Sequence, residues 1–188
     1  MLLQKRYAAS DPMKAAIIIG HTPASPGATS RRGYVTEWNY NSFLAPLIED
    51  RAASDCIIVE RGLPNDYDGL PAKVNATGAD FAIELHANAF NGEASGTEML
   101  YWHSSTKGKQ LAEILQTEIL RALGLRHRGI KPCRRADRGG YLLQKTRMPC
   151  VIAEPFFIDH DGDLEAATRG MCRLAEAYAS AIDHYASE

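Results

Sequence analysis

The stretch at residues 81–88, which reads FAIELHAN, places a carboxylate and an imidazole inside an otherwise apolar segment. Its apolar residues indicate a buried strand of a layered α/β sheet. A buried charge is costly unless it is paired, so Glu84 and His86 need a reason to be there. Because they are two residues apart, both side chains lie on the same face of the strand. We therefore expect functional chemistry where this strand opens into the polar loop after it.

Short apolar runs alternate along the chain with segments of helical periodicity. We expect strands at residues 14–19, 56–59, 81–86, 97–102 and 150–153, and helices from 37 onward and at 70–77, 107–123 and 163–185. Residues 126–140 read as a long basic loop, and 142–143 as a short strand. This alternation predicts an α/β sheet covered by helices on both faces. Residues 1–13 read as an N-terminal leader, and residues 14–188 as one domain.

Composition excludes several classes of function. The net charge of −2 gives no electrostatic reason to bind nucleic acid or an anionic membrane. The first residues lack the apolar run of a signal peptide, and no stretch reaches membrane-span length. We therefore expect a protein made in the cytoplasm, without an integral membrane segment. The four cysteines have no metal-type or CxxC spacing, which favours reduced thiols.

Four chemically capable side chains come from separate segments and are expected at one edge of the sheet. In open α/β sheets, ligands bind beyond the carboxyl ends of the strands. His21 follows the first expected strand, His86 ends the third, and Glu154 ends the last. Glu37 falls in the first turn of a helix that Thr36 is suited to cap, and the start of this helix should lie on the same rim.

Two histidines and one glutamate are a sufficient ligand set for a catalytic zinc ion with an open fourth position. Zinc lowers the pKa of a bound water from about 16 to around 7, and we assign the transfer of that water's proton to Glu154. Each residue also has an ordinary interpretation. A histidine after a strand commonly makes only a hydrogen bond, Glu37 suits the helix dipole, and Glu154 can be an ion-pair partner. Their joint placement is what favours a metal site.

The order of the motifs resembles the zinc-dependent N-acetylmuramoyl-L-alanine amidases of the type 3 class. The resemblance covers about residues 17–185 and rests on Gly20-His21, Gly27-Ala28, Glu37, residues 79–89, Gly96-Thr97-Glu98, residues 128–131 and residues 148–157. It implies that His21, Glu37 and His86 bind Zn²⁺ and that Glu154 is the catalytic glutamate. The implied substrate is the amide between N-acetylmuramic acid and L-alanine in peptidoglycan or a muropeptide. The implied fold is a single three-layer αβα catalytic domain around a mixed, mostly parallel sheet of about six strands.

The sequence departs from the family pattern at Glu84, where serine is usual, and at Thr22-Pro23, where glycines are common. Glu84 either orients a ligand imidazole or pairs with an arginine such as Arg61 or Arg147. Asn88 is a further candidate for the pocket. The basic loop, which includes Arg134, Arg135 and Arg138, is either a solvated surface or a contact for stem-peptide carboxylates.

Three other functions remain open at the level of the sequence. One is another zinc amidohydrolase or a carboxypeptidase that acts on wall peptides, and another is a cysteine hydrolase that uses Cys150. The third is a non-catalytic peptidoglycan-binding protein. Without a signal peptide, the chain reads as a phage-type lysin that reaches the wall after release, or as a cytosolic enzyme acting on recycled wall fragments. The sequence does not indicate an oligomeric state.

Overall fold

Strands and helices alternate along the chain as the sequence predicts. The computed structural model describes residues 13–188. The elements are β1 (Ala15–Ile19), α1 (Glu37–Arg51), β2 (Cys56–Glu60), α2 (Leu70–Asn75), β3 (Phe81–Leu85), β4 (Thr97–Trp102), α3 (Thr106–Leu123), β5 (His127–Cys133), α4 (Gly140–Lys145), β6 (Cys150–Glu154), α5 (Asp161–Arg169) and α6 (Met171–Ala186). The leader expected at residues 1–13 lies outside the described residues except for Met13, which packs against the core.

The six strands form one mixed sheet in the order β2-β1-β3-β6-β4-β5. The pairs β1–β2, β1–β3, β3–β6 and β4–β5 are parallel, whereas β4 runs antiparallel to β6. The mostly parallel, six-stranded sheet is therefore confirmed. The carboxyl ends of β2, β1, β3 and β6 consequently lie at one edge of the sheet.

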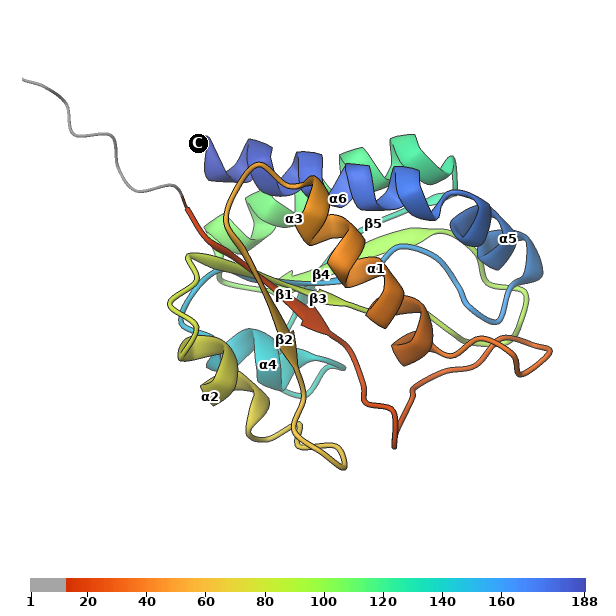
Figure 1. Cartoon of the computed structure of the whole chain (residues 1–188), viewed down its shortest axis with the longest axis horizontal. Helices are drawn as coiled ribbons and strands as arrows, with labels where there is room; N and C mark the ends of the chain where they lie inside the picture. The colour runs from red at the N-terminus through yellow and green to blue at the C-terminus, as the bar shows by residue number, and fades with distance from the viewer. Residues whose placement is uncertain (1–12) are drawn as a thin grey trace, which may run out of the picture.

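Helices cover both faces of the sheet, which makes three layers (Figure 1). Successive side chains of a strand point to opposite faces. Ile17 of β1 and Ile83 of β3 therefore belong to the core under α1, α3 and α6. Ile18 and Ile152 belong to a second core that packs against α2 and α4. These last two helices have six residues each, against 15 to 18 in the other three, so the second layer is much thinner.

The region expected as a basic loop contains a strand and leads into a helix. β5 pairs only with β4 at the edge of the sheet. An edge strand tolerates Pro132, whose missing N–H is not needed for pairing on the open side. The expected strand at 142–143 is wrong, because Leu142 and Leu143 lie in α4, where both are buried.

The expected terminal helix is two helices, α5 and α6, which meet at Gly170. Glycine is a poor helix former, which accounts for the division. At the other end of the chain, Thr36 caps α1 as predicted, because its hydroxyl accepts a hydrogen bond from Asn39 N at 3.2 Å. Pro46 lies inside α1 and does not end it, because the helix continues to Arg51. Within residues 13–188, the structure contains no helix with the length and apolarity to span a membrane.

Candidate metal centre

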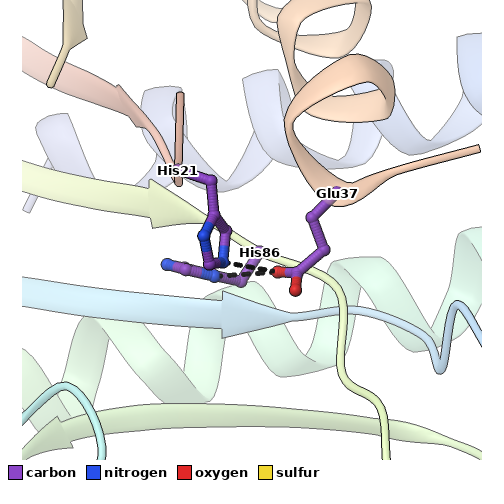
Figure 2. Close-up of side chains that lie close together, drawn as sticks. All are labelled: His21, Glu37 and His86. Atoms are coloured by element: carbon purple, nitrogen blue, oxygen red, sulfur yellow. Dashed lines mark hydrogen bonds and ion pairs between the residues drawn. The ribbon is translucent and has the colours of Figure 1, made fainter. Parts of the chain in front are cut away.

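His21, Glu37 and His86 converge beyond the carboxyl edge of the sheet (Figure 2). His21 follows β1, Glu37 begins α1, and His86 follows β3. The Glu37 Oε2 atom lies 2.9 Å from His86 Nδ1 and 3.4 Å from His21 Nε2. One possible ligand atom from each residue lies within 4.8 Å of the other two. The three side chains from separate segments are therefore brought together as expected.

Two glycines make room for the imidazole rings. A Cβ atom at Gly20 would overlap the carbonyl oxygen of Leu85 and come within 2.8 Å of the His86 ring. A Cβ atom at Gly27, where φ is +79°, would lie 2.6 Å from the His21 ring. His21 itself has a positive φ of 69°, which is uncommon for a residue with a side chain and costs energy. The backbone is thus shaped around the two rings.

The carboxylate of Glu37 is fully buried and held from several sides. Its Oε1 accepts a hydrogen bond from Ala28 N at 2.8 Å, and its Oε2 accepts one from Ala87 N at 3.1 Å. Burial alone would raise the pKa of Glu37, but the neighbouring His21 and His86 rings hold it well below its ordinary value. Glu37 is therefore charged at neutral pH.

The donor set and its surroundings fit a divalent metal ion. The Nε2 atom of His21 is buried, and apart from the 3.4 Å approach of Glu37 Oε2 it has no hydrogen-bond partner within residues 13–188, which is costly unless something else binds it. Two imidazoles and a carboxylate are ligands that zinc prefers, and three protein ligands leave a position open. The residues present thus provide both an unpaired donor and the right chemistry for an ion.

Glu84 lies on the far side of the His86 ring from Glu37. Its Oε2 is 3.2 Å from His86 Nε2, and its Oε1 accepts a hydrogen bond from Arg61 Nη2 at 2.8 Å. Glu84 therefore contacts both the His86 imidazole and an arginine, which is Arg61. Despite burial, the neighbouring His86 and Arg61 lower the pKa of Glu84 to about 2. Burial opposes the charged form of His86, but Glu84 and Glu37 raise its pKa to about 10.

Glu154 ends β6 and is also buried. Its Oε1 accepts a hydrogen bond from Arg138 Nη2 at 2.9 Å, while its Oε2 has no partner among the residues that the structure describes. Burial raises the pKa of Glu154 to about 7, although His86 and Arg138 pull it down. A carboxyl group with a pKa near neutrality can both accept and return a proton, which is what a general acid–base catalyst requires.

All of these side chains line one pocket of about 570 Å³. Leu100 and Ile152, which point from the strands toward the layer of α2 and α4, also line it. The sheet is therefore open at this point, because the two short helices do not cover it. The wall of the pocket is completed by Gly27, Ala28, Asn65, Tyr67, Ala89 and Gly139.

Other residues singled out in the sequence lie elsewhere. The Asn88 amide donates a hydrogen bond to Glu98 at 2.8 Å, and Asn88 is not among the residues that line the pocket. Cys150 begins β6, at the opposite end of this strand from Glu154, and burial raises the pKa of its thiol. A buried thiol of this kind is a poor nucleophile, which argues against a cysteine hydrolase.

Only one arginine of the basic loop reaches the pocket. Arg135 bonds Gln144 at 2.8 Å, and neither Arg134 nor Arg135 lines the pocket, whereas Arg138 does. Nothing in the sequence distinguishes Arg138 from its neighbours. Asn65 and Tyr67, which follow β2, were also missed, because an asparagine and a tyrosine in a polar loop give no specific signal.

A mixed α/β sheet that carries a His–Glu–His cluster and a buried glutamate in one pocket defines a candidate metal-dependent hydrolase. The chain belongs to the N-acetylmuramoyl-L-alanine amidase family, which it matches over residues 16–184. This match covers nearly all of the domain expected at residues 14–188.

Among individual proteins, an uncharacterized cell wall amidase of Bacillus anthracis is 35% identical over 117 residues, which are 56% of this chain and 21% of that protein. The amidase LytC of Bacillus subtilis is 31% identical over 94 residues, or 48% of this chain and 18% of LytC. The matches span between 18% and 55% of the length of these curated relatives.

Solved structures share the fold. An N-acetylmuramoyl-L-alanine amidase of Clostridium difficile 630 superimposes with a TM-score of 0.83 and 22% identity, covering 95% of this chain and 99% of that one. The catalytic domain of an endolysin targeting Clostridia difficile gives a TM-score of 0.76 with 27% identity, covering 90% of this chain and 96% of that one. At 22% identity, the comparison with the Clostridium difficile 630 amidase shows a shared fold.

Proposed function

We propose that this chain is a zinc-dependent hydrolase that cleaves the amide between N-acetylmuramic acid and L-alanine in peptidoglycan. The observation that carries the proposal is the convergence of His21, Glu37 and His86 beside Glu154 in one pocket. Membership of the amidase family supports the choice of bond. The two imidazoles and the Glu37 carboxylate would hold the ion, and Glu154 would carry the proton.

When bound, Zn²⁺ supplies Lewis-acid chemistry that polarises a carbonyl and makes water nucleophilic near neutral pH. Glu154 accepts the proton of the attacking water on its unpaired Oε2 and returns it to the nitrogen of L-alanine as the amide bond breaks. The Arg138 guanidinium holds the other oxygen of Glu154 in place. No side chain needs to form a covalent bond to the substrate.

Digestion of purified peptidoglycan, with and without a chelator, tests this function. We expect mass analysis to find stem peptides with a free N-terminal L-alanine, a product that disappears with the chelator and returns with added zinc. Glu154→Gln should lower the rate about 10²- to 10⁴-fold. Full cleavage by Glu154→Gln, or cleavage that the chelator does not affect, would contradict the proposed chemistry.

The same digest separates the alternatives that share a metal site. A carboxypeptidase would release a C-terminal amino acid and leave the sugar–peptide amide intact. A non-catalytic wall-binding protein would bind the zinc and the peptidoglycan but release nothing. The unpaired Oε2 of a glutamate with a raised pKa favours an enzyme over a binding protein.

We further propose that the chain acts as a phage-type lysin. The support is its 27% identity to the catalytic domain of an endolysin. A lysin should solubilise intact peptidoglycan sacculi, whereas an enzyme for recycled wall fragments in the cytosol should cleave small muropeptides and leave sacculi unchanged. Turbidity of a sacculus suspension measures the difference.

A further inference from the structure

The guanidinium groups of Arg61 and Arg138 line the pocket beside the groups that would hold the ion and move the proton. The proposed chemistry leaves N–H donors of both groups without a role. We propose that Arg61 and Arg138 form a subsite for a carboxylate of the substrate. The ligand would be a stem peptide with a free carboxylate on the residue that follows L-alanine. This inference rests on the proposed function and narrows its substrate.

The loop before α4 is built to bring Arg138 to the pocket. Gly139 has a φ of +76°, and a Cβ atom there would overlap Ile152 Cδ1, a side chain that lines the pocket. A Cβ atom at Gly140 would overlap the carbonyl oxygen of Arg134. Gly139 therefore allows the chain to pass close over β6, and Gly140 allows the loop to close on its own backbone. At the end of this loop Arg138 Nη2 lies 2.9 Å from Glu154 Oε1.

Arg138 has donors to spare. Its side chain is 58% exposed, and within residues 13–188 its hydrogen-bond partner is Glu154, through Nη2 alone. A guanidinium carries five N–H donors in a planar fork that suits carboxylates. Arg138 can thus bind an incoming carboxylate while it still holds Glu154.

Arg61 is the fixed member of the pair. Its side chain is only 6% exposed, lies over the ring of Tyr67 and is anchored by Glu84 at 2.8 Å. Nη1 reaches Asn65 Oδ1 at a long 3.4 Å, and Nε has no partner among the described residues. The guanidinium is therefore under-bonded where it borders the pocket.

The charge balance of the pocket favours an anion once the ion is bound. The lining contains three carboxylates, those of Glu37, Glu84 and Glu154, and two guanidiniums. A divalent ion held by neutral imidazoles leaves this lining with a net charge of +1. Each guanidinium also bonds a carboxylate of the candidate site. Arg61 bonds Glu84, which contacts the candidate ligand His86, and Arg138 bonds Glu154, the proposed proton carrier. A carboxylate bound there would belong to a residue close to the scissile amide.

A matched pair of muramoyl peptides tests the subsite. The two substrates differ only in whether the residue after L-alanine carries a free carboxylate or the corresponding amide. We expect the zinc-loaded wild type to prefer the free acid about tenfold or more in kcat/KM, the range that a hydrogen-bonded charge supplies. The preference should appear mainly in KM, since the carboxylate is bound and does not react.

The quantity to measure is the ratio of kcat/KM for the free acid to kcat/KM for the amide. Both values come from the same protein sample, so differences in folding or zinc content between variants cancel. Arg138→Gln and Arg61→Lys should each reduce the preference at least threefold. Lysine keeps the charge beside Glu84 but loses the planar fork. Arg135→Gln is the matched control, since Arg135 bonds Gln144 and does not line the pocket; it should keep the full preference.

A binding measurement that needs no turnover completes the test. Calorimetry with the two product dipeptides should give tighter binding of the free acid than of the amide, and Arg138→Gln should remove the difference. Equal kcat/KM for acid and amide in the wild type would overturn the subsite while leaving the amidase function intact. Arginine variants that slow both substrates equally would show that Arg61 and Arg138 only hold Glu84 and Glu154. Failure of the wild type to cleave either substrate would instead count against the proposed function.

Discussion

The buried ion pair between Arg61 and Glu84 has a measurable effect at the scale of single residues. Removing one partner of a buried pair leaves an uncompensated charge. Arg61→Met should therefore destabilise the protein by about 3 kcal/mol, and adding Glu84→Gln in the same chain should recover much of this loss. Urea unfolding of the two single variants and the double variant gives the coupling energy.

The pair between Arg121 and Glu118 on α3 is the matched control. Its atoms are 2.7 Å apart, but the arginine side chain is 69% exposed. Exposed pairs stabilise a protein by about 0–1 kcal/mol, so Arg121→Met should change the free energy of unfolding by less than about 1 kcal/mol. An equal loss of unfolding free energy in Arg61→Met and Arg121→Met would mean that the buried charge of Glu84 does not need Arg61 as its partner.

Glu154 should make the metal-free protein less stable as the pH rises. Its pKa is about 7 in the folded protein, above the ordinary value of 4.5, so folding favours the protonated form. The stabilisation is fully present below about pH 4.5 and is lost as the pH rises to 7, a difference on the order of 3 kcal/mol. Glu154→Gln, which mimics the protonated form, should have a higher Tm than the wild type above pH 7.

This advantage of Glu154→Gln should shrink below pH 5, where the wild-type carboxyl is protonated too. Thermal melts of both metal-free proteins between pH 4.5 and 8.5 follow it. A constant difference in Tm across this range would show that the effect comes from shape and not from charge. A more stable but inactive Glu154→Gln would be an exchange of stability for function at the site.

The convergence of the four candidate site residues could be predicted because each follows, ends or begins a recognisable element. His21 and His86 come after apolar strands, Glu154 ends another, and Glu37 begins a helix. Parallel strands then bring these ends to one edge of the sheet. Arg138 could not be singled out, because its approach to Glu154 depends on a backbone turn at Gly139 that no side-chain pattern encodes.

At the scale of elements, the turn at Gly139 should control both stability and activity. Gly139→Ala would place a Cβ atom against Ile152 and would force a side-chain residue into a φ of +76°. We expect a loss of at least about 1 kcal/mol in stability, together with a lower kcat because Arg138 moves away from Glu154.

Gly124→Ala at the end of α3 separates the two effects. Gly124 also has a positive φ, of 65°, but nothing lies within 4 Å of the position of its Cβ atom. This variant should lose a similar amount of backbone stability and keep the activity of each folded molecule. Chemical unfolding and steady-state kinetics on both variants provide the comparison. Unchanged kcat in Gly139→Ala would separate the turn from the position of Arg138.

The elements that the sequence did not predict are those that depend on a neighbour. β5 contains Gly129 and Pro132, which oppose strand formation on their own, and it forms because β4 offers a free edge. α4 has only six residues, and its buried leucines fit a short helix as well as a short strand. Long or strongly apolar elements such as α3 and β3 can be predicted from their own residue pattern, without knowledge of their neighbours.

At the scale of the whole molecule, the unequal thickness of the two helical layers decides where a ligand can bind. α1, α3 and α6 cover one face of the sheet, and the shorter helices α2 and α4 cover the other (Figure 1). On this second face Leu100 and Ile152 line the pocket, although both side chains are largely buried. His86, Glu84 and Glu154 alternate onto this thinner side. The α/β class predicts that the site lies at the carboxyl edge of the sheet. Which of the two faces carries the pocket depends on the lengths of the covering helices.

Because the candidate ligands come from three separate segments, an ion bound by them should tie the whole fold together. His21 follows β1, Glu37 begins α1, and His86 follows β3, and an unfolded chain cannot hold them in this geometry. A ligand that binds only the folded state adds about 2.7 kcal/mol at a hundredfold excess over its Kd. For a domain of this size, that corresponds to a rise in Tm of roughly 5–10 °C. Thermal melts with zinc and with chelator should show this difference.

His21→Ala should lose most of that rise, since it removes one of the three candidate ligands. His103→Ala is the control, because His103 is exposed at the end of β4 and does not line the pocket; it should keep the full rise. If zinc raised the Tm of His21→Ala as much as that of the wild type, the ion would be bound somewhere else on the protein. The link between the three segments, and with it the proposed route to activity, would then be excluded.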